Sequence, residues 1–486
     1  MSSQNTKPMN LLYIFSDQHN KTITGCYGNP HVHTPNLDKL AANGVRFDNA
    51  YTNSPICVPA RASMTIGDYC FRHSYWDNAH PYEGKEEGWG HRLTQQGYKV
   101  TTIGKLHYKD NIPETGFPDQ RIPMNVKGAI GDLTQTIRDG SMVRPFLKQE
   151  VLTAGVGDSD YLLYDKKTAQ LAADFLKNEA TLENNPWCLY VGFVCPHFPW
   201  KVPQEIMDLY TPYDKIPMPA GWSLKDRSMH PAIVKFREEL CINDGEISDE
   251  DMRKVVATYY GMVTYLDQQI GMVLDALEAA GLAENTRIIY ASDHGDAVGE
   301  NGLFFKHTMV EGSVGIPLIM SGPDLPKGTS VESCVSLVDM FPTILESVGA
   351  DRKPEDMDLP GMSLLPLAKG EIQIDRPVFS ETHCIGFNDG VFMLRYKQYK
   401  YIYYINYEPQ LFDLEKDPHE LVDLIHNPEY SDIVNMMDEK LRDICDPEET
   451  DQRAKKEQMA LLEQHGGKEK VMKNILSFSP IPDSAR

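Results

Sequence analysis

Four apolar runs separated by long polar stretches constrain the fold of this chain more than any other feature. They cover residues 10–15, 99–103, 187–194 and 287–291, and more than 80 residues separate each run from the next. A short run that stays apolar without alternating is typical of a strand buried on both faces of a parallel sheet. Parallel strands need long crossover connections, which these intervals supply. The pattern therefore predicts an α/β fold around a large, mostly parallel sheet.

Helical patterns occupy the intervals between the runs. Residues 162–180 are amphipathic, and residues 248–280 begin with Ser248 as an N-cap and carry an apolar stripe. Thr34 and Pro35 are expected to open a shorter helix that Gly44 ends. These helices are predicted to flank the sheet.

A long insertion and a second domain complete the predicted organisation. Residues 109–158 are rich in Gly, Pro and Asp and are expected to form a loop-like insertion that shapes a substrate pocket. The tyrosine-rich residues 391–414 predict a small antiparallel sheet. We therefore divide the chain into an α/β domain, 1–375, and a C-terminal α+β subdomain, 376–486. Within the subdomain, 431–463 is expected to be helical and the tail, 468–486, to pack on another subunit.

Polar side chains follow each of the four apolar runs. The residues are Asp17 and Gln18, Lys105 and His107, His197, and Asp293 with His294. Ligands of open α/β sheets bind beyond the carboxyl ends of the strands. Any one of these residues alone fits a structural role, but together they predict a site at one edge of the sheet.

A single cysteine lies at a predicted helix start. Cys57 precedes Pro59 by two residues and Arg61 by four, and the helix is expected to run from Pro59 to Ile66 before Gly67. A helix N-terminus and an arginine one turn later favour an oxyanion. From these residues alone, a buried cysteine before an ordinary helix is an equal alternative.

The pattern C-x-P-x-R followed by A-S resembles the motif of the formylglycine-dependent sulfatases, members of the alkaline-phosphatase superfamily. Further matches are the strand-end residues, the Asp77-Asn78 pair, Lys306 and residues 411–418. Gln18 and the Asp293-His294 pair resemble the choline-sulfatase and phosphonate monoester hydrolase subgroups in particular. The resemblance implies an alkaline-phosphatase-like fold, with 1–375 as the catalytic domain.

The resemblance also implies how the site works. Cys57 would be oxidised to formylglycine, whose hydrated aldehyde is the nucleophile. One divalent metal is implied, calcium first, with magnesium or manganese as alternatives. Its implied ligands are Asp17, Gln18, Cys57, Asp293 and His294.

The remaining matched residues would handle the substrate. The side chains implied to stabilise the transferring sulfuryl group are Arg61, Lys105 and Lys306. His197 would protonate the departing oxygen, and His107 would deprotonate the second hydroxyl of the formylglycine hydrate. Asn78 would bind substrate.

Composition bears on location and partners. The polar N-terminal ten residues do not resemble a secretory signal, and nine scattered cysteines suit a reduced, cytoplasmic protein. The net charge of −23 argues against nucleic acid and membrane partners and suits a neutral or cationic leaving group. The resemblance implies that the substrate is a small organic sulfate ester, with choline sulfate as one candidate. A maturation enzyme and a second copy of the chain are the expected protein partners.

Three other functions compete with the sulfatase interpretation. A phosphonate monoester or phosphodiester hydrolase using the same site stays open. An inactive binding protein is disfavoured because the implied ligand set is intact. A hydrolase with a serine or threonine nucleophile is also disfavoured, because Ser54 and Ser63 lack the spacing of Cys57 to proline and arginine.

Overall fold

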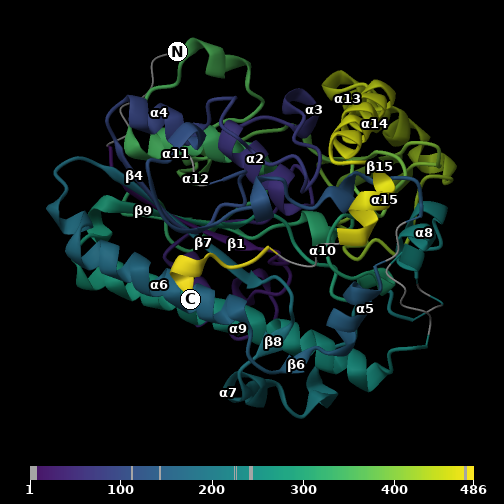
Figure 1. Cartoon of the computed structure of the whole chain (residues 1–486), viewed down its shortest axis with the longest axis horizontal. Helices are drawn as coiled ribbons and strands as arrows, with labels where there is room; N and C mark the ends of the chain where they lie inside the picture. The colour runs from purple at the N-terminus through teal and green to yellow at the C-terminus, as the bar shows by residue number, and fades with distance from the viewer. Residues whose placement is uncertain are drawn as a thin grey trace.

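An eight-stranded sheet forms the centre of the molecule in the computed structural model, which describes residues 8–110, 113–141, 144–223, 225, 227–239, 245–474 and 479–486 (Figure 1). The strand order is β11-β2-β10-β9-β1-β7-β4-β5. In chain order the strands are β1 (Asn10–Asp17), β2 (Gly44–Phe47), β4 (Lys99–Lys105), β5 (Asp119–Met124), β7 (Trp187–Pro196), β9 (Thr286–Ser292), β10 (Leu318–Ser321) and β11 (Thr329–Val331). Only β10 runs antiparallel to its neighbours. The predicted α/β class with a mixed, mostly parallel sheet is confirmed.

Strand β1 shows why the apolar runs do not alternate with polar residues. Leu12 and Ile14 belong to one apolar core, whereas Leu11, Tyr13 and Phe15 belong to the core on the opposite face. All five side chains are fully buried. A strand covered on both faces needs apolar residues at consecutive positions.

Helices cover both faces of the sheet (Figure 1). The two long helices α6 (Asp160–Asn178) and α9 (Asp249–Ala279) pack on one face, as their amphipathic patterns predicted. The other face carries α2 (Cys57–Ile66), α4 (Trp89–Gln95) and α11 (Met340–Val348). Within the described part of the chain, each helix is too short or too polar to cross a bilayer.

A second, four-stranded antiparallel sheet forms near the C-terminus, as predicted. Its strands are β13 (Val378–Thr382), β14 (Val391–Tyr396), β15 (Tyr399–Tyr404) and β16 (Gln410–Asp413), in that order. Helix α13 (Ser431–Ile444) packs on β14 and β15. The domain boundary at residue 375 stays a prediction, and β13 begins three residues after it.

The helical character predicted for residues 431–463 is confirmed. It is divided between two helices, α13 and α14 (Pro447–Gln464), because proline favours a helix start and Asp446 caps the second helix by accepting the Glu449 N–H at 2.9 Å. The short helix α1 (Pro35–Ala42) ends before Gly44, which instead begins β2.

The insertion 109–158 has more regular structure than predicted. It contains the edge strand β5 and the helix α5 (Pro145–Leu152). Pro123 obscures β5 in the sequence, but an edge strand tolerates a residue that cannot donate a hydrogen bond.

The described end of the tail, residues 479–486, packs on its own chain, and its expected packing on another subunit stays a prediction. Ile481 and Ala485 join the main apolar core, and the Tyr161 hydroxyl donates to the Ser479 carbonyl oxygen at 2.8 Å. Residues 475–478 of the predicted tail lie outside the described residues.

Candidate active site

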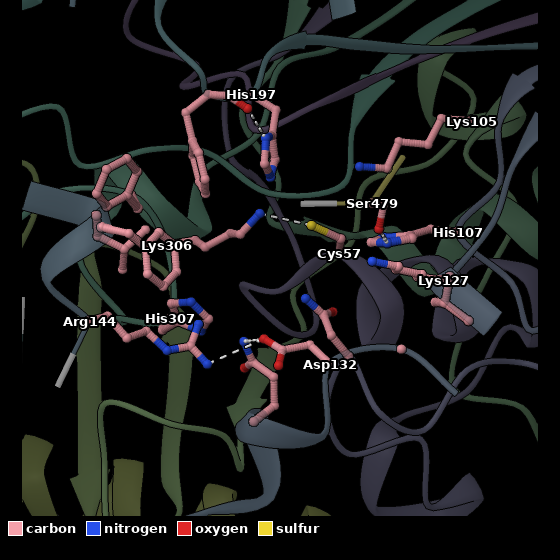
Figure 2. Close-up of a pocket in the computed structure, with 18 of the residues that line it drawn as sticks. Cys57, Lys105, His107, Lys127, Asp132, Arg144, His197, Lys306, His307 and Ser479 are labelled. Atoms are coloured by element: carbon pink, nitrogen blue, oxygen red, sulfur yellow. Dashed lines mark hydrogen bonds and ion pairs between the residues drawn. The ribbon is translucent and has the colours of Figure 1, made fainter. Parts of the chain in front are cut away.

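The carboxyl ends of four neighbouring strands bring the predicted polar residues to one edge of the main sheet. Asp17 ends β1 and Lys105 ends β4, while His197 follows β7 and Asp293 follows β9. These strands are adjacent in the order β9-β1-β7-β4. Figure 2 shows Lys105 and His197 directed into one pocket. The convergence expected from the sequence is therefore present.

Cys57 is the first residue of α2, which the sequence predicted to start two residues later and to end before Gly67. Gly67 adopts φ 82 and closes the helix. The Asn78 side-chain oxygen accepts the Val58 N–H at 3.1 Å and satisfies one free donor at the helix start. Asn78 also lines the pocket, so it both fixes the start of α2 and faces the site.

The Cys57 thiol lies among the other predicted site residues. Its Sγ is 2.8 Å from Lys306 Nζ, 3.3 Å from His294 Nε2 and 3.8 Å from Asp17 Oδ1. Burial and the charge of Asp17 raise the pKa of the thiol, so it stays protonated at neutral pH. Because the thiolate is the reactive form, the unmodified cysteine is a poor nucleophile.

Four buried donors are placed as a metal site requires. One ligand atom from each of Asp17, Cys57, Asp293 and His294 lies within 4.8 Å of all the others. Two oxygens on opposite sides of a calcium ion are about 5 Å apart, twice the usual bond length of roughly 2.3–2.6 Å. The Gly295 carbonyl oxygen accepts a hydrogen bond from His294 Nδ1 at 2.9 Å, which directs the lone pair of Nε2 toward the cluster. The donor set therefore fits a single cation.

Gln18, the fifth predicted ligand, borders this cluster. Its side-chain amide donates to Asp296 Oδ2 at 2.5 Å, and its oxygen accepts from Lys306 Nζ at 2.9 Å. Asp296 thereby fixes which end of the amide faces the site. The oxygen of Gln18 is turned toward the same lysine that contacts Cys57.

Arg61, which the resemblance implied would stabilise the sulfuryl group, does not line the pocket. It is fully buried, and its guanidinium donates to Asp293 at 2.9 Å and to Asp17 at 3.2 Å. Its other donors bond the Tyr190 hydroxyl and the carbonyl oxygens of Ser16 and Lys105. With all its donors engaged, Arg61 positions the two carboxylates.

Two lysines beside the metal-binding cluster, Lys105 and Lys306, add positive charge that faces the pocket. Burial alone would raise the pKa of Asp17, but Lys105, 2.5 Å away, together with His197 and Lys306 holds it well below its ordinary value. Burial likewise would lower the pKa of Lys306, but Cys57 and Asp17 raise it. Asp17 is therefore ionised and Lys306 protonated at neutral pH, as an anion-binding site needs.

Both predicted catalytic histidines line the pocket and are neutral. Burial and the neighbouring lysines hold the pKa of His197 and of His107 well below the usual range. The Phe198 carbonyl oxygen accepts from His197 Nδ1 at 2.6 Å, which leaves Nε2 for the pocket. His107 Nε2 lies 2.8 Å from the Ser479 hydroxyl, and its Nδ1 has no partner in the part of the chain that the structure describes.

Strained backbone surrounds this site. Gln18, His107, Phe305 and His307 have φ of 68, 62, 65 and 82, a region that residues other than glycine rarely adopt. Such strain persists where the surroundings hold a side chain in a required direction. All four residues contact the site or line its pocket.

Sequence reasoning missed several pocket residues. The insertion 109–158 supplies Lys127, Asp132 and Arg144, which confirms that it shapes the pocket. His307 also lines it, and its position beside Lys306 was the one available signal. Ser479 comes from the C-terminal tail, where no sequence pattern marked it.

Comparison with known proteins agrees with this geometry. A family model described as Sulfatase matches residues 9–350, and one described as N-sulphoglucosamine sulphohydrolase, C-terminal, matches residues 299–447. A choline-sulfatase of Rhizobium meliloti (strain 1021) is 31% identical over 429 residues, which cover 86% of this chain and 83% of that protein. An arylsulfatase K of Canis lupus familiaris is 31% identical over 460 residues, which cover 90% of this chain and 82% of that protein.

Solved structures share the fold. A phosphonate monoester hydrolase of Agrobacterium radiobacter superposes with a TM-score of 0.69 at 24% identity, covering 90% of this chain and 95% of that one. A protein in complex with its substrate D-glucosamine-2-N,6-O-disulfate superposes with a TM-score of 0.71 at 22% identity, covering 93% of this chain and 99% of that one.

Proposed function

The chain belongs to the sulfatase family of sulfuric ester hydrolases, and we propose that it hydrolyses a sulfate monoester to an alcohol or phenol and inorganic sulfate. One observation carries the proposal. The buried Cys57 contacts Lys306 and lies within a cluster of metal-binding donors, in a pocket lined by three further histidines.

We propose that Asp17, Asp293, His294, the Gln18 oxygen and the modified residue 57 hold one calcium ion. Carboxylate and amide oxygens are the ligands that a hard cation prefers. When bound, the cation would neutralise a sulfate oxygen and lower the pKa of a neighbouring hydroxyl. Arg61 pairs with both Asp17 and Asp293 and holds the two carboxylates in place for this purpose.

The remaining roles belong to side chains that face the pocket. Formylglycine at position 57 would supply the nucleophilic hydroxyl, and the 2.8 Å contact of Cys57 Sγ with Lys306 supports placing that oxygen next to a cation. Lys105 and Lys306 would stabilise the transferring sulfuryl group. His107, neutral and with Nδ1 unpartnered among the described residues, would accept the proton of the second hydroxyl. Binding of the anionic ester would favour a proton on His197 Nε2, which would then pass to the leaving oxygen.

Replacing His197 with alanine tests its role as general acid. A poor leaving group depends on protonation, so we expect His197→Ala to lower kcat/KM for an alkyl sulfate by about 10²–10⁴-fold and for 4-nitrophenyl sulfate by much less. His31→Ala, at an exposed histidine outside this pocket, should change neither. Equal losses on both substrates would reassign His197 to binding or structure.

A phosphonate monoester hydrolase is the second candidate, because such an enzyme shares the fold with a TM-score of 0.69. Esters with a common 4-nitrophenol leaving group separate the two functions. We expect kcat/KM for 4-nitrophenyl sulfate to exceed that for 4-nitrophenyl phenylphosphonate by at least about tenfold, a difference of about 1.4 kcal/mol in transition-state binding. The opposite preference would replace the proposed function with the second candidate.

Three further proposals from the sequence concern the cellular location, the oligomeric state and the maturation of the enzyme. They are a cytoplasmic location, a homo-oligomer, and a formylglycine-generating maturation enzyme as a partner. The last is supported by the unreactive state of the buried, protonated Cys57, which needs modification before it can serve as a nucleophile.

A further inference from the structure

We infer that the substrate's leaving group carries a carboxylate, which Arg144 and Lys127 bind at the outer end of the pocket. This inference rests on the proposed function and names the class of ester that the site takes. It differs from the sequence-based expectation of a neutral or cationic leaving group. The net charge of the chain suggested that expectation, but the side chains that line the pocket carry the opposite sign from the chain as a whole.

Arg144 is a buried cation with unused donor capacity. Only 8% of the residue is exposed. One terminal nitrogen donates to Thr134 Oγ1 at 2.7 Å and lies 3.3 Å from Asp132 Oδ2. Its Nε, also buried, has no partner in the described residues. A buried donor without a partner is costly, so a ligand that supplies an acceptor here would be favoured.

The carboxylates around Arg144 do not neutralise the combined positive charge of Arg144 and Lys127. Asp132 already accepts from the backbone and side chain of Thr134 and from Gln135 Nε2. Glu239 also acts on Arg144, but burial raises its pKa to about 7, so it carries only part of a charge at neutral pH. Lys127 adds an exposed cation that reaches in from the side opposite Arg144 (Figure 2). The outer pocket is therefore net positive.

The chemistry of this end favours a carboxylate on an apolar frame. Guanidinium presents neighbouring donors in a plane that matches the two oxygens of a carboxylate. The centre of the Phe146 ring lies 6.0 Å from the Arg144 guanidinium carbon, and Leu147 and Val126 also line the pocket. Such apolar side chains suit one face of a sugar or aryl ring. A quaternary ammonium would meet two cations here.

Matched aryl sulfates test the inference in the mature, metal-loaded enzyme. We expect kcat/KM for 3-carboxyphenyl sulfate to exceed that for its neutral isostere, 3-carbamoylphenyl sulfate, by about 10- to 100-fold, the usual contribution of a hydrogen bond to a charged group. A 3-(trimethylammonio)phenyl sulfate should be the poorest substrate although its leaving group is the most activated. A 3-sulfonatophenyl sulfate distinguishes a planar carboxylate from a second sulfate-like anion, and we expect it to rank below the carboxylate.

Substitution of Arg144 tests whether this residue causes the preference for a carboxylate on the leaving group. Arg144→Met should reduce the carboxylate preference to less than about threefold. Arg144→Lys keeps the charge but not the forked pair of donors, so it should retain part of the preference. Arg121→Met is the matched control. Arg121 is also paired with carboxylates, those of Asp119 and Glu179, but it lies outside the pocket, so the preference should persist.

Three other outcomes of these measurements would overturn the inference of a carboxylate-bearing leaving group. Turnover of phenyl sulfate without a carboxylate preference would overturn this inference and leave the proposed function intact. So would equal losses on every substrate in both Arg144 variants, which would make Arg144 a structural ion pair. Turnover of the phosphonate ester without turnover of any sulfate would overturn the proposed function and this inference together.

Discussion

Replacing Cys57 with alanine is expected to abolish sulfate ester turnover, with a loss of at least about 10⁴-fold, as removal of a nucleophile that acts as part of a unit does. The same loss is expected when the wild-type chain is made without a formylglycine-generating enzyme. In that state residue 57 is a buried thiol whose pKa is raised by burial and by Asp17, so it cannot replace the hydrated aldehyde. Mass spectrometry of the peptide that contains Cys57 should show that the modified fraction scales with activity.

Controls separate a chemical loss from a folding defect. Cys57 is fully buried, but it is small, and alanine in its place leaves little empty volume. Cys57→Ala should therefore melt close to the wild type and still bind sulfate through Lys105 and Lys306. Cys26→Ala, at a partly exposed cysteine that does not line the pocket, should stay fully active. Full activity in a preparation with only unmodified cysteine would remove residue 57 as the nucleophile.

The parts of the site that sequence could predict are those fixed by strand ends. Asp17, Lys105, His197 and Asp293 follow apolar runs, and parallel strands bring their carboxyl ends to one edge of the sheet. The convergence of these residues follows from the strand topology alone, so predicting it needs no information on side-chain packing. Cys57 joined this set through its motif and its place at a helix start.

Other parts could not be predicted because they depend on tertiary contacts. The residues next to Arg61 in the sequence do not indicate whether its side chain faces the substrate or the metal-binding carboxylates. Its hydrogen bonds to the Tyr190 hydroxyl and the Lys105 carbonyl oxygen, which direct it toward the carboxylates, form only in the folded chain. Arg144 lies in an insertion whose short elements give weak patterns. Ser479 reaches His107 from the far end of the chain, a contact at a separation of 372 residues that no local pattern encodes.

Asp293→Asn is expected to lose the metal ion and at least about 10³-fold in kcat/KM, because a bound cation contributes several kcal/mol of charge stabilisation. The amide keeps the size of the side chain and can still accept from Arg61, 2.9 Å away in the wild type. It cannot supply the negative charge that a hard cation needs from its few ligands. Metal content measured by mass spectrometry should fall well below one ion per chain, and chelation of the wild type should give the same loss of turnover.

The choice of asparagine over alanine decides what this experiment can show. Asp293→Ala would also leave the buried Arg61 without one of its two counter-ions, and breaking a buried pair costs about 3–5 kcal/mol of stability. Metal loss could then follow from unfolding. Asp356→Asn, which weakens the buried ion pair with Arg92 away from the pocket, controls for that effect and should keep its metal. If Asp293→Asn retained a full complement of metal, the carboxylate would not be a ligand, and its role would be structural, as the acceptor of hydrogen bonds from Arg61 and from the Gln18 and His294 N–H groups.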